Sequence, residues 1–434
     1  MSVNELSKKP LIEKDEPLIK IGAGKKWFFF AIMYGLFMID FIARTGINAV
    51  FPVLQKDLQL TNTQIGTLSS VVLFGMAVFV LPVSFLGEKY SPKKAINISA
   101  FIWSIGSILS GIVTSFSALV MSRFFVGTGN AAYAPLSNSL ITSMYPKKQW
   151  GKIVGLYNTA MTFGGAAGAL IFANLANSYG WRAAFLVVGM VSLVLSILSL
   201  LLPETKKYVV KANGNVVKKE KNKVNLGAAV IIVLKNKALL LTCFGAGLGV
   251  MVLQALGTYA AIYYVQVCGM SVGLAAALLG TSNLIAALGY PVGGILMDLW
   301  YKKDKRSRVF LPAISLLFCA VLYGVGFKFA IVPVLLSGQF FYTLGNTGFH
   351  TASQELVPSW FKSVSYGVYV LFIQLMGAMG PLLTGILSDS IGLTNALIGI
   401  QFLFVLATLS LVAAGIFYLK DYQAARNAEI EVDK

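Results

Sequence analysis

Long apolar runs constrain this chain more than any other feature. About 20 apolar residues are enough for a helix to cross the hydrocarbon core of a bilayer. Only 12% of the 434 residues are charged, and the mean hydropathy is +0.75. A soluble domain carries about 25% charged residues, so the composition predicts an all-α integral membrane protein. We identify twelve candidate transmembrane segments, at residues 27–52, 62–86, 95–115, 117–144, 151–177, 183–202, 236–266, 271–299, 309–329, 331–356, 364–388 and 394–419.

The distribution of basic residues predicts how these segments are oriented. The chain has 35 Lys and Arg residues against 17 Asp and Glu residues. If the N-terminus is cytoplasmic, every basic residue falls in an inner segment except Arg44, Lys56, Arg123, Arg182 and Lys328. This positive-inside pattern predicts a multi-pass protein of the cell (inner or plasma) membrane with both termini in the cytoplasm. The net charge of +18 therefore does not indicate a nucleic-acid partner. Binding of lipid headgroups by basic runs such as 218–223 stays open.

A polar, lysine-rich stretch divides the apolar segments into two sets. It is the only long polar insert between spans, and it predicts a linker between two six-helix bundles. The expected organisation is a cytoplasmic tail at 1–26, an N-terminal bundle at 27–202, a cytoplasmic linker at 203–235, a C-terminal bundle at 236–419 and a cytoplasmic tail at 420–434.

An internal repeat supports this division. A shift of 212 residues superimposes 146–180 on 358–392 without gaps, with identities that include Pro146/Pro358, Gly155/Gly367, Tyr157/Tyr369, Gly165/Gly377, Gly168/Gly380 and Gly180/Gly392. Small residues let helices approach closely in lipid, so the recurring glycines predict duplicated packing. Two halves related by parallel repeat symmetry predict a central cavity between them.

Two loops also match each other. "GILMD" at 294–298 contains Gly294 and Asp298, and "SFLGEKYSPKK" at 84–94 has Ser84 and Glu88 at the same spacing. These loops, together with "SRFFVGTGNAAYAP" at 122–135 and "GWRAAF" at 180–185, resemble the motifs of the major facilitator superfamily over essentially the whole chain. The resemblance implies alternating access and a cytoplasmic gating loop. The gating residues would be Glu88, Lys93, Lys94, Gly294 and Asp298.

Within that superfamily, the chain is similar to the anion:cation symporters and to the Spinster-like carriers. Both have an acid and an arginine in the first span, here Asp40 and Arg44, followed by a motif that reads "FPVLQKDL". Both usually have a glutamate in the fourth span, where this chain has Asn130. The motifs do not separate the two subfamilies.

Asp40 is the only acid expected near the centre of a span, and Arg44 lies one helical turn further on. An ionised side chain in the bilayer is costly, and it normally faces a partner or a water-filled cavity. Asp40 and Arg44 could simply neutralise each other. Alternatively, Asp40 binds and releases a proton, because burial favours its neutral form and a nearby guanidinium favours its ionised form. Protonation would then free Arg44 or Arg123 to hold an anion through paired hydrogen bonds.

Asparagine cannot titrate, so proton coupling would fall to Asp40, with His350 as the second candidate because histidine titrates near neutral pH. Uniport or a sodium-linked cycle stays open. Other polar residues expected in the spans could line the cavity or bond neighbouring helices. With Arg44 and Arg123, the predicted substrate-binding residues are Asn130, Tyr133, Tyr157, Tyr259, Asn283, Asn346 and Gln374, and further candidates are Tyr34, Asn138, Asn158 and Gln254.

Walker-type loops, catalytic triads and metal-ligand spacings are absent from the sequence. We therefore expect no enzymatic activity, no cofactor and no metal. The sequence predicts a monomeric secondary transporter in the lipid bilayer, which couples protons to the transport of a small organic anion with a carboxylate or phosphate group. The alternatives are a Spinster-like carrier of lysolipid or another amphiphile, a proton/drug antiporter, and a receptor built on the same fold. The stretch "TAMTFGGAAGAL" at 159–170 lacks the proline that is typical of drug antiporters.

Overall fold

The computed structural model describes residues 21–89, 91–131, 133–204, 210–212, 215–217, 236–358 and 361–432. The N-terminal group of helices consists of α1 (Ala23–Leu58), α2 (Asn62–Lys89), α3 (Pro92–Ile112), α4 (Phe116–Asn130), α5 (Tyr133–Met144), α6 (Trp150–Tyr179) and α7 (Trp181–Leu198). The C-terminal group consists of α9 (Lys237–Gln266), α10 (Val272–Tyr301), α11 (Ser307–Phe329), α12 (Val332–Glu355), α13 (Lys362–Ile391), α14 (Leu393–Gly399) and α15 (Phe402–Val432). Two short 3-10 helices cover Lys147–Gln149 and Ser199–Leu201.

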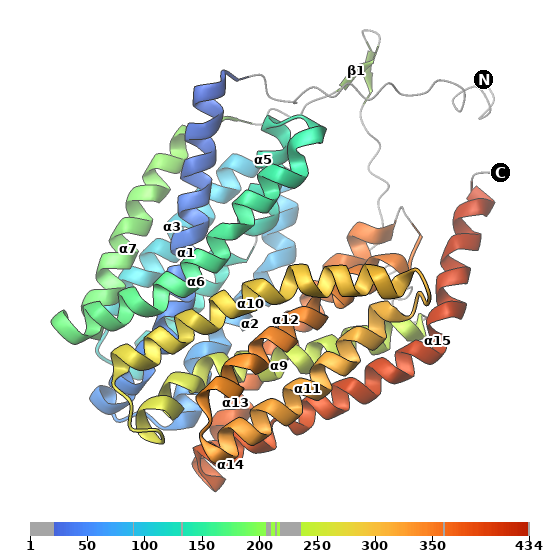
Figure 1. Cartoon of the computed structure of the whole chain (residues 1–434). Coiled ribbons are helices and arrows are strands. Elements are labelled where there is room, and N and C mark those ends of the chain that lie inside the picture. The colour runs from blue at the N-terminus through green and yellow to red at the C-terminus, as the bar shows by residue number, and fades with distance from the viewer. Residues whose placement is uncertain are drawn as a thin grey trace.

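The segment between the groups contains a small antiparallel hairpin. Strands β1 (Val210–Ala212) and β2 (Asn215–Val217) pair in the register Val210↔Val217. Figure 1 shows this hairpin on the same side of the molecule as the start of α1. We call this side the termini side, and the opposite side the far side. The other residues of the predicted linker, and those of the N-terminal tail before residue 21, lie outside the described residues.

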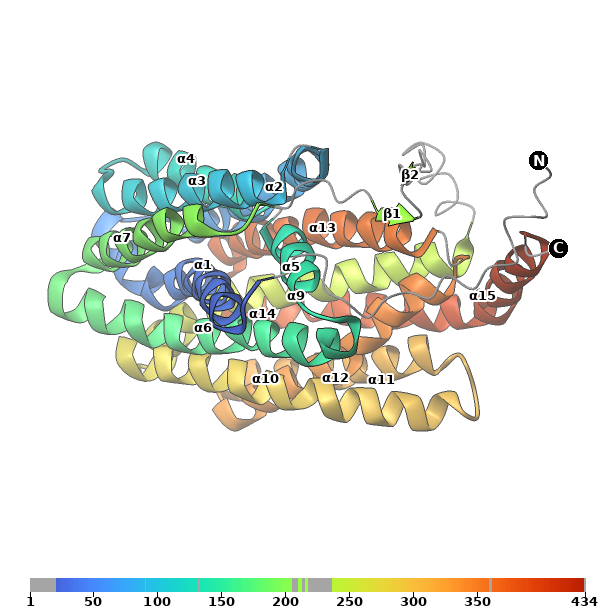
Figure 2. The same ribbon diagram turned by 90° about the horizontal axis from the view of Figure 1, so that it is seen from above.

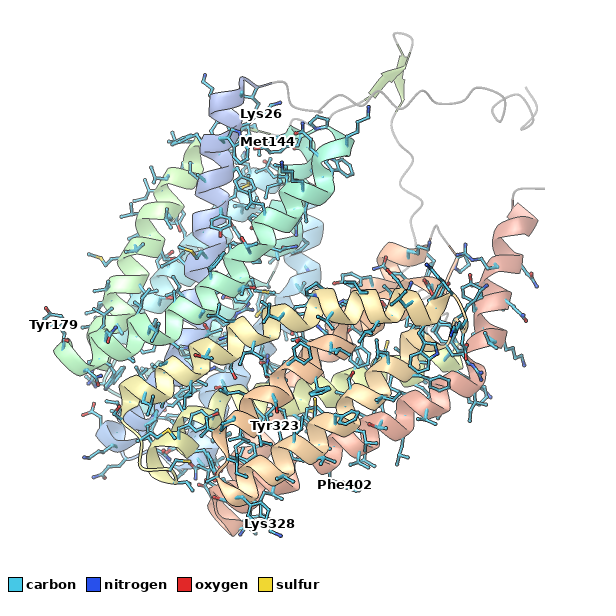
Figure 3. The ribbon with its side chains drawn as sticks, viewed as in Figure 1. Lys26, Met144, Tyr179, Tyr323, Lys328 and Phe402 are labelled. Carbon is cyan, nitrogen blue, oxygen red and sulfur yellow. The ribbon has the colours of Figure 1, made fainter. Side chains whose placement is uncertain are left out.

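The two groups of helices meet toward the far side and spread apart toward the termini side (Figure 1). Seen from above, α10 runs beside α6, and α13 runs beside α2 (Figure 2). In Figure 3, Lys26 and Met144 lie at the termini-side end of the N-terminal group, whereas Lys328 lies at the far-side end of the C-terminal group. The predicted topology also puts Lys26 and Lys328 on opposite sides of the membrane.

Each of the twelve predicted segments is largely helical, and the all-helical fold is confirmed. Ten segments of the described chain are long and apolar enough to cross a membrane. The predicted segment 117–144 is not among them, because it divides into α4 and α5, which are each too short. The segment 331–356 is also not among them, since the second half of α12 carries many polar residues.

Both helix interruptions have local causes. Proline lacks an N–H group and clashes with the carbonyl four residues earlier. Pro135 at the start of α5 therefore cannot donate the helical bond to the Ala131 carbonyl, and Ala131 directly follows the end of α4. Between α14 and α15, the Gln401 side chain Nε2 donates to the Leu397 carbonyl at 2.8 Å. This bond competes with the helical bond of the backbone, which instead runs from the Gln401 N–H to the Ile398 carbonyl. A side chain inserted in this way interrupts a helix.

The internal repeat is visible in the backbone. Gly180 follows α6 with φ 84° and ψ 156°, and its repeat partner Gly392 follows α13 with φ 85° and ψ 152°. Positive φ favours glycine because other residues have a Cβ atom that crowds the backbone. The packing also recurs, since Gly168 of α6 lies against Ile42 of α1 and Gly380 of α13 lies against Met251 of α9. These paired positions support the prediction of duplicated packing.

Replacing Gly180 by valine is expected to destabilise the protein by about 1–3 kcal/mol, because a β-branched residue is strained at positive φ. A Cβ atom at Gly180 would meet nothing within 4 Å, so the loss would come from the backbone alone. Thermal unfolding in detergent measures the effect. The matched control is Gly155→Ala within α6, where a Cβ atom also meets nothing within 4 Å. The control should keep or slightly raise its melting temperature, because alanine is favoured over glycine inside a helix. A Gly180→Val variant as stable as the wild type would contradict the explanation.

Candidate functional site

A cavity of about 300 Å³ is lined by Arg44 and Arg123, the two arginines that the sequence places within spans. It lies between helices of both groups, and we call it the arginine cavity. It is lined by Phe41, Arg44, Thr45, Ile47, Asn48, Ser69, Val72, Leu73, Arg123, Gln254, Thr258, Gln374 and Pro381.

The two guanidinium groups in this cavity have few partners. Arg123 on α4 is only 1% exposed, and in the part of the chain that the structure describes its Nε and Nη1 atoms have no hydrogen-bond partner. Its guanidinium carbon lies 5.7 Å from the centre of the Phe185 ring. Arg44 lies over the Phe41 ring at 4.1 Å, and among the described residues its Nη1 donates only to the Met76 sulfur, at 3.5 Å. Thioether sulfur is a weak acceptor, so both side chains keep donors available for an anion.

Asp40 lies one turn before Arg44 on α1 and is 4% exposed. Its Oδ1 atom has no hydrogen-bond partner within the described ranges. The carboxyl group interacts electrostatically with Arg44 and Arg123. The described residues nevertheless show no direct ion pair between Asp40 and either arginine. Asp40 therefore interacts with the two arginines without a direct ion pair.

A second cavity of about 310 Å³ adjoins the first, and we call it the amide–tyrosine cavity. The two cavities share Phe41, Thr45, Asn48 and Gln254. The polar residues in the second cavity come mainly from the C-terminal group. Besides the shared ones, they are Thr162, Tyr264, Ser282, Asn283, Tyr290, Tyr323, Gln339, Tyr342 and Thr343. Amide and hydroxyl groups both donate and accept hydrogen bonds. This cavity thus offers neutral polar contacts beside the cationic ones.

The comparison with known proteins decides the family. A model of the Major Facilitator Superfamily matches residues 33–381. The chain belongs to the Major Facilitator Superfamily. It is therefore a transporter and not an enzyme, and it is a multi-pass membrane protein.

Several relatives of this Major Facilitator Superfamily transporter have names that state a substrate. The chain is 24% identical to the hexuronate transporter of Bacillus subtilis over 368 residues, which cover 82% of this chain and 86% of that one. It is 25% identical to a probable galactarate/D-glucarate transporter of the same organism, over 86% of this chain and 89% of the relative.

Among solved structures, the chain resembles a bacterial homologue of the human lysosomal transporter Spinster, in an inward-facing and unoccupied conformation. The TM-score is 0.77 with 22% identity, over 94% of this chain and 99% of that one. This likeness shows the fold.

The transporter brings together only some of the predicted substrate-binding residues. Arg44, Arg123 and Gln374 line the arginine cavity, and Asn283 lines the amide–tyrosine cavity. Asn346 lines neither of these two cavities, but its Nδ2 lies 3.5 Å from the hydroxyl of Tyr290, which does.

The other predicted residues line neither of these two cavities. The Tyr133 hydroxyl donates to the Met33 carbonyl at 2.9 Å, and the Tyr157 hydroxyl donates to the Ser137 hydroxyl at 2.8 Å. Asn130 is buried at the end of α4, and neither its amide nitrogen nor its amide oxygen has a hydrogen-bond partner among the residues that the structure describes. Two of the remaining candidates have other contacts. The Tyr259 hydroxyl donates to the Asn62 carbonyl on the far side, where the two groups meet, and His350 packs against the rings of Tyr366 and Tyr369.

The predicted gating residues lie at the termini-side ends of their helices. Asp298 on α10 pairs with Arg308 at 3.4 Å, and Arg308 also pairs with Glu355 at 3.4 Å. Lys94 has its backbone N–H bonded to the Ser91 cap of α3 at 3.4 Å, and Lys93 lies in the same first turn. A Cβ atom at Gly294 would meet nothing within 4 Å. The side chain of Glu88 lies outside the described residues.

Asn48 is a cavity residue that the sequence reasoning missed. It lines both cavities. It follows Arg44 by four residues, as Arg44 follows Asp40, and residues four apart share a face of a helix. The spacing 40, 44 and 48 therefore contained the signal. By contrast, Gln339 and Tyr342 line the amide–tyrosine cavity because of how α12 packs, and no local spacing in the sequence indicates this.

Proposed function

We propose that this protein transports a small organic anion by alternating access and that protons drive the transport. The observation that supports this best is a single cavity bordered by Arg44 and Arg123, which both keep donors available. The proposed arrangement is a monomer with twelve spans in two six-helix halves, in the cell membrane with both termini cytoplasmic. The far side would then be the outer side, so that this structure is inward-facing.

The substrate class follows from the chemistry of the two cavities. A guanidinium group can hold a carboxylate by two parallel hydrogen bonds. The adjoining amide–tyrosine cavity could bind hydroxyl groups of the same molecule. Both relatives described above are named for sugar acids. We therefore propose a hydroxylated carboxylate, such as a sugar acid, with its acid group at Arg44 and Arg123.

The proton would be carried by Asp40. Its carboxyl group is buried, lacks a partner at Oδ1 and interacts electrostatically with both arginines. In the unprotonated form it competes with the substrate for the arginines, and protonation removes that competition. His350 lies against Tyr366 and Tyr369 and lines neither of the two cavities. We therefore assign coupling to Asp40 and not to His350.

A ligand-dependent stability screen tests the proposed substrate. Purified protein is heated in detergent with hexuronates, aldarates, the matching neutral sugars or lysolipids. A sugar acid is expected to raise the melting temperature, because binding only to the folded state stabilises it. The matching neutral sugar should have no effect at the same concentration. Stabilisation by lysolipid alone would contradict the anion proposal and would support the Spinster-like alternative.

A further inference from the structure

The far-side contact between the two groups contains a carboxylate that no motif singles out. Asp389, near the end of α13, accepts hydrogen bonds from two backbone N–H groups at the start of α2. Oδ1 accepts from Asn62 at 2.9 Å, and Oδ2 accepts from Thr63 at 2.8 Å. The C-terminal group thereby holds the first turn of a helix in the N-terminal group.

The start of α2 shows why this contact matters. The first four N–H groups of a helix have no partner within the helix. Thr61 and Gln64 form a capping box: the Gln64 N–H donates to the Thr61 hydroxyl at 3.2 Å, and the Thr61 N–H donates to the Gln64 side chain at 2.9 Å. The remaining two N–H groups belong to Asn62 and Thr63, and Asp389 accepts both. The cap of α2 is thus complete only when the two groups are together.

Three further hydrogen bonds join the two groups in the same region. The Asn62 side chain donates to the Ser388 hydroxyl at 2.9 Å, and the Tyr259 hydroxyl donates to the Asn62 carbonyl at 2.6 Å. Gln266 at the end of α9 donates to Gln55 at the end of α1, at 3.0 Å. All of these hydrogen bonds between the two groups, including those of Asp389, lie on the far side.

Helices α13 and α2 approach each other closely beside Asp389. A Cβ atom at Gly385, one turn before Asp389, would lie 2.6 Å from the Asn62 carbonyl oxygen and 2.8 Å from the Thr63 Cα. The backbones of α13 and α2 therefore nearly touch at this point. A carboxylate beside a helix N-terminus also gains from the partial positive charge of the helix end. Asp389 combines that charge with two directed hydrogen bonds.

We propose that Asp389 is the latch that keeps the far side closed. Opening of the far side must separate α13 from α2, which leaves the N–H groups of Asn62 and Thr63 without their acceptor. The latch therefore stabilises the closed far side relative to the open one, and its loss shifts the population toward the open state. The inference needs only the movement of the two groups, and it does not depend on the substrate.

Hydrogen–deuterium exchange of the full-length, substrate-free protein tests this latch. In Asp389→Ala, amide exchange at 62–66 is expected to rise at least about tenfold, because exchange reports local opening. Exchange should rise in parallel at the far-side ends of α1 and α9, and it should fall on the termini side as that side closes. Asp389→Asn retains one acceptor oxygen and should give a smaller shift in the same direction, which keeps the test usable if the alanine variant does not fold.

The matched control is Asp57→Ala. Asp57 is also a far-side carboxylate, but it bonds within the N-terminal group, to the Trp181 indole N–H at 2.8 Å and to Arg182 at 3.1 Å. Its removal should leave exchange at 62–66 unchanged. If Asp389→Ala speeds exchange only within the first turn of α2, Asp389 is a simple helix cap and the latch proposal is wrong. Unchanged exchange at 62–66 would also overturn it.

Discussion

The variant Arg123→Lys is expected to lose at least about 100-fold in affinity for the transported anion, which corresponds to about 3 kcal/mol. Lysine keeps the positive charge but replaces a planar fork with a single point charge, so it cannot make paired hydrogen bonds to a carboxylate. Arg123 is buried, and two of its nitrogens have no partner in the described structure. Isothermal titration with the best anion from the stability screen measures the loss.

The control for this variant is Arg182→Lys. Arg182 is a half-exposed arginine that pairs with Asp57 on the far side and lines neither of the two cavities. Its substitution should leave the affinity for the anion unchanged. Both variants must have the same melting temperature as the unliganded wild type. A loss of binding can then not be explained by a loss of folding. Unaltered affinity in a folded Arg123→Lys variant would contradict anion recognition by Arg123.

The variant Asp40→Asn is expected to lose uptake driven by a pH gradient by at least about tenfold, while exchange of substrate across the membrane continues. Asparagine resembles a protonated carboxyl group in shape but cannot release a proton. The arginines would then be permanently free of competition, and the protein would bind substrate without coupling it to protons. Proteoliposomes loaded with substrate distinguish the two activities, because exchange needs no gradient.

Asp57→Asn serves as the control for Asp40→Asn. It removes a carboxylate that is partly exposed on the far side and that bonds to Trp181 and Arg182. Uptake driven by the pH gradient should continue in this variant. If Asp40→Asn also retains this uptake, Asp40 does not carry the proton. If Asp40→Asn loses exchange as well, the residue is needed for binding itself and the coupling role is not supported.

The charged residues of the candidate site stand out in the sequence because burying charge in a membrane is costly. Asp40, Arg44 and Arg123 are conspicuous in apolar segments, and the structure brings all three within electrostatic range. The repeat was equally readable, because paired glycines such as Gly180 and Gly392 have the same unusual backbone conformation. Such features depend on local chemistry, which a sequence displays directly.

The neutral part of the site was less predictable. Tyr133, Tyr157 and Tyr259 resemble cavity residues in the sequence, yet their hydroxyl groups bond to nearby helices. A tyrosine in a span can face either a cavity or a neighbouring helix, and periodicity does not distinguish these. The prediction of one span at 117–144 does not include its division into α4 and α5, although the motif contains Pro135. The role of Asp389 depends on contact with residues more than 300 positions away, at Asn62.

Proton movement that accompanies the anion is the most direct test of the account. Wild-type protein is reconstituted into liposomes without an imposed pH gradient, and a pH-sensitive dye reports the external medium when the anion is added. Coupled entry of anion and proton is expected to make the medium more alkaline, whereas the matching neutral sugar should not. Uptake of the labelled anion with no change in external pH would contradict proton coupling through Asp40.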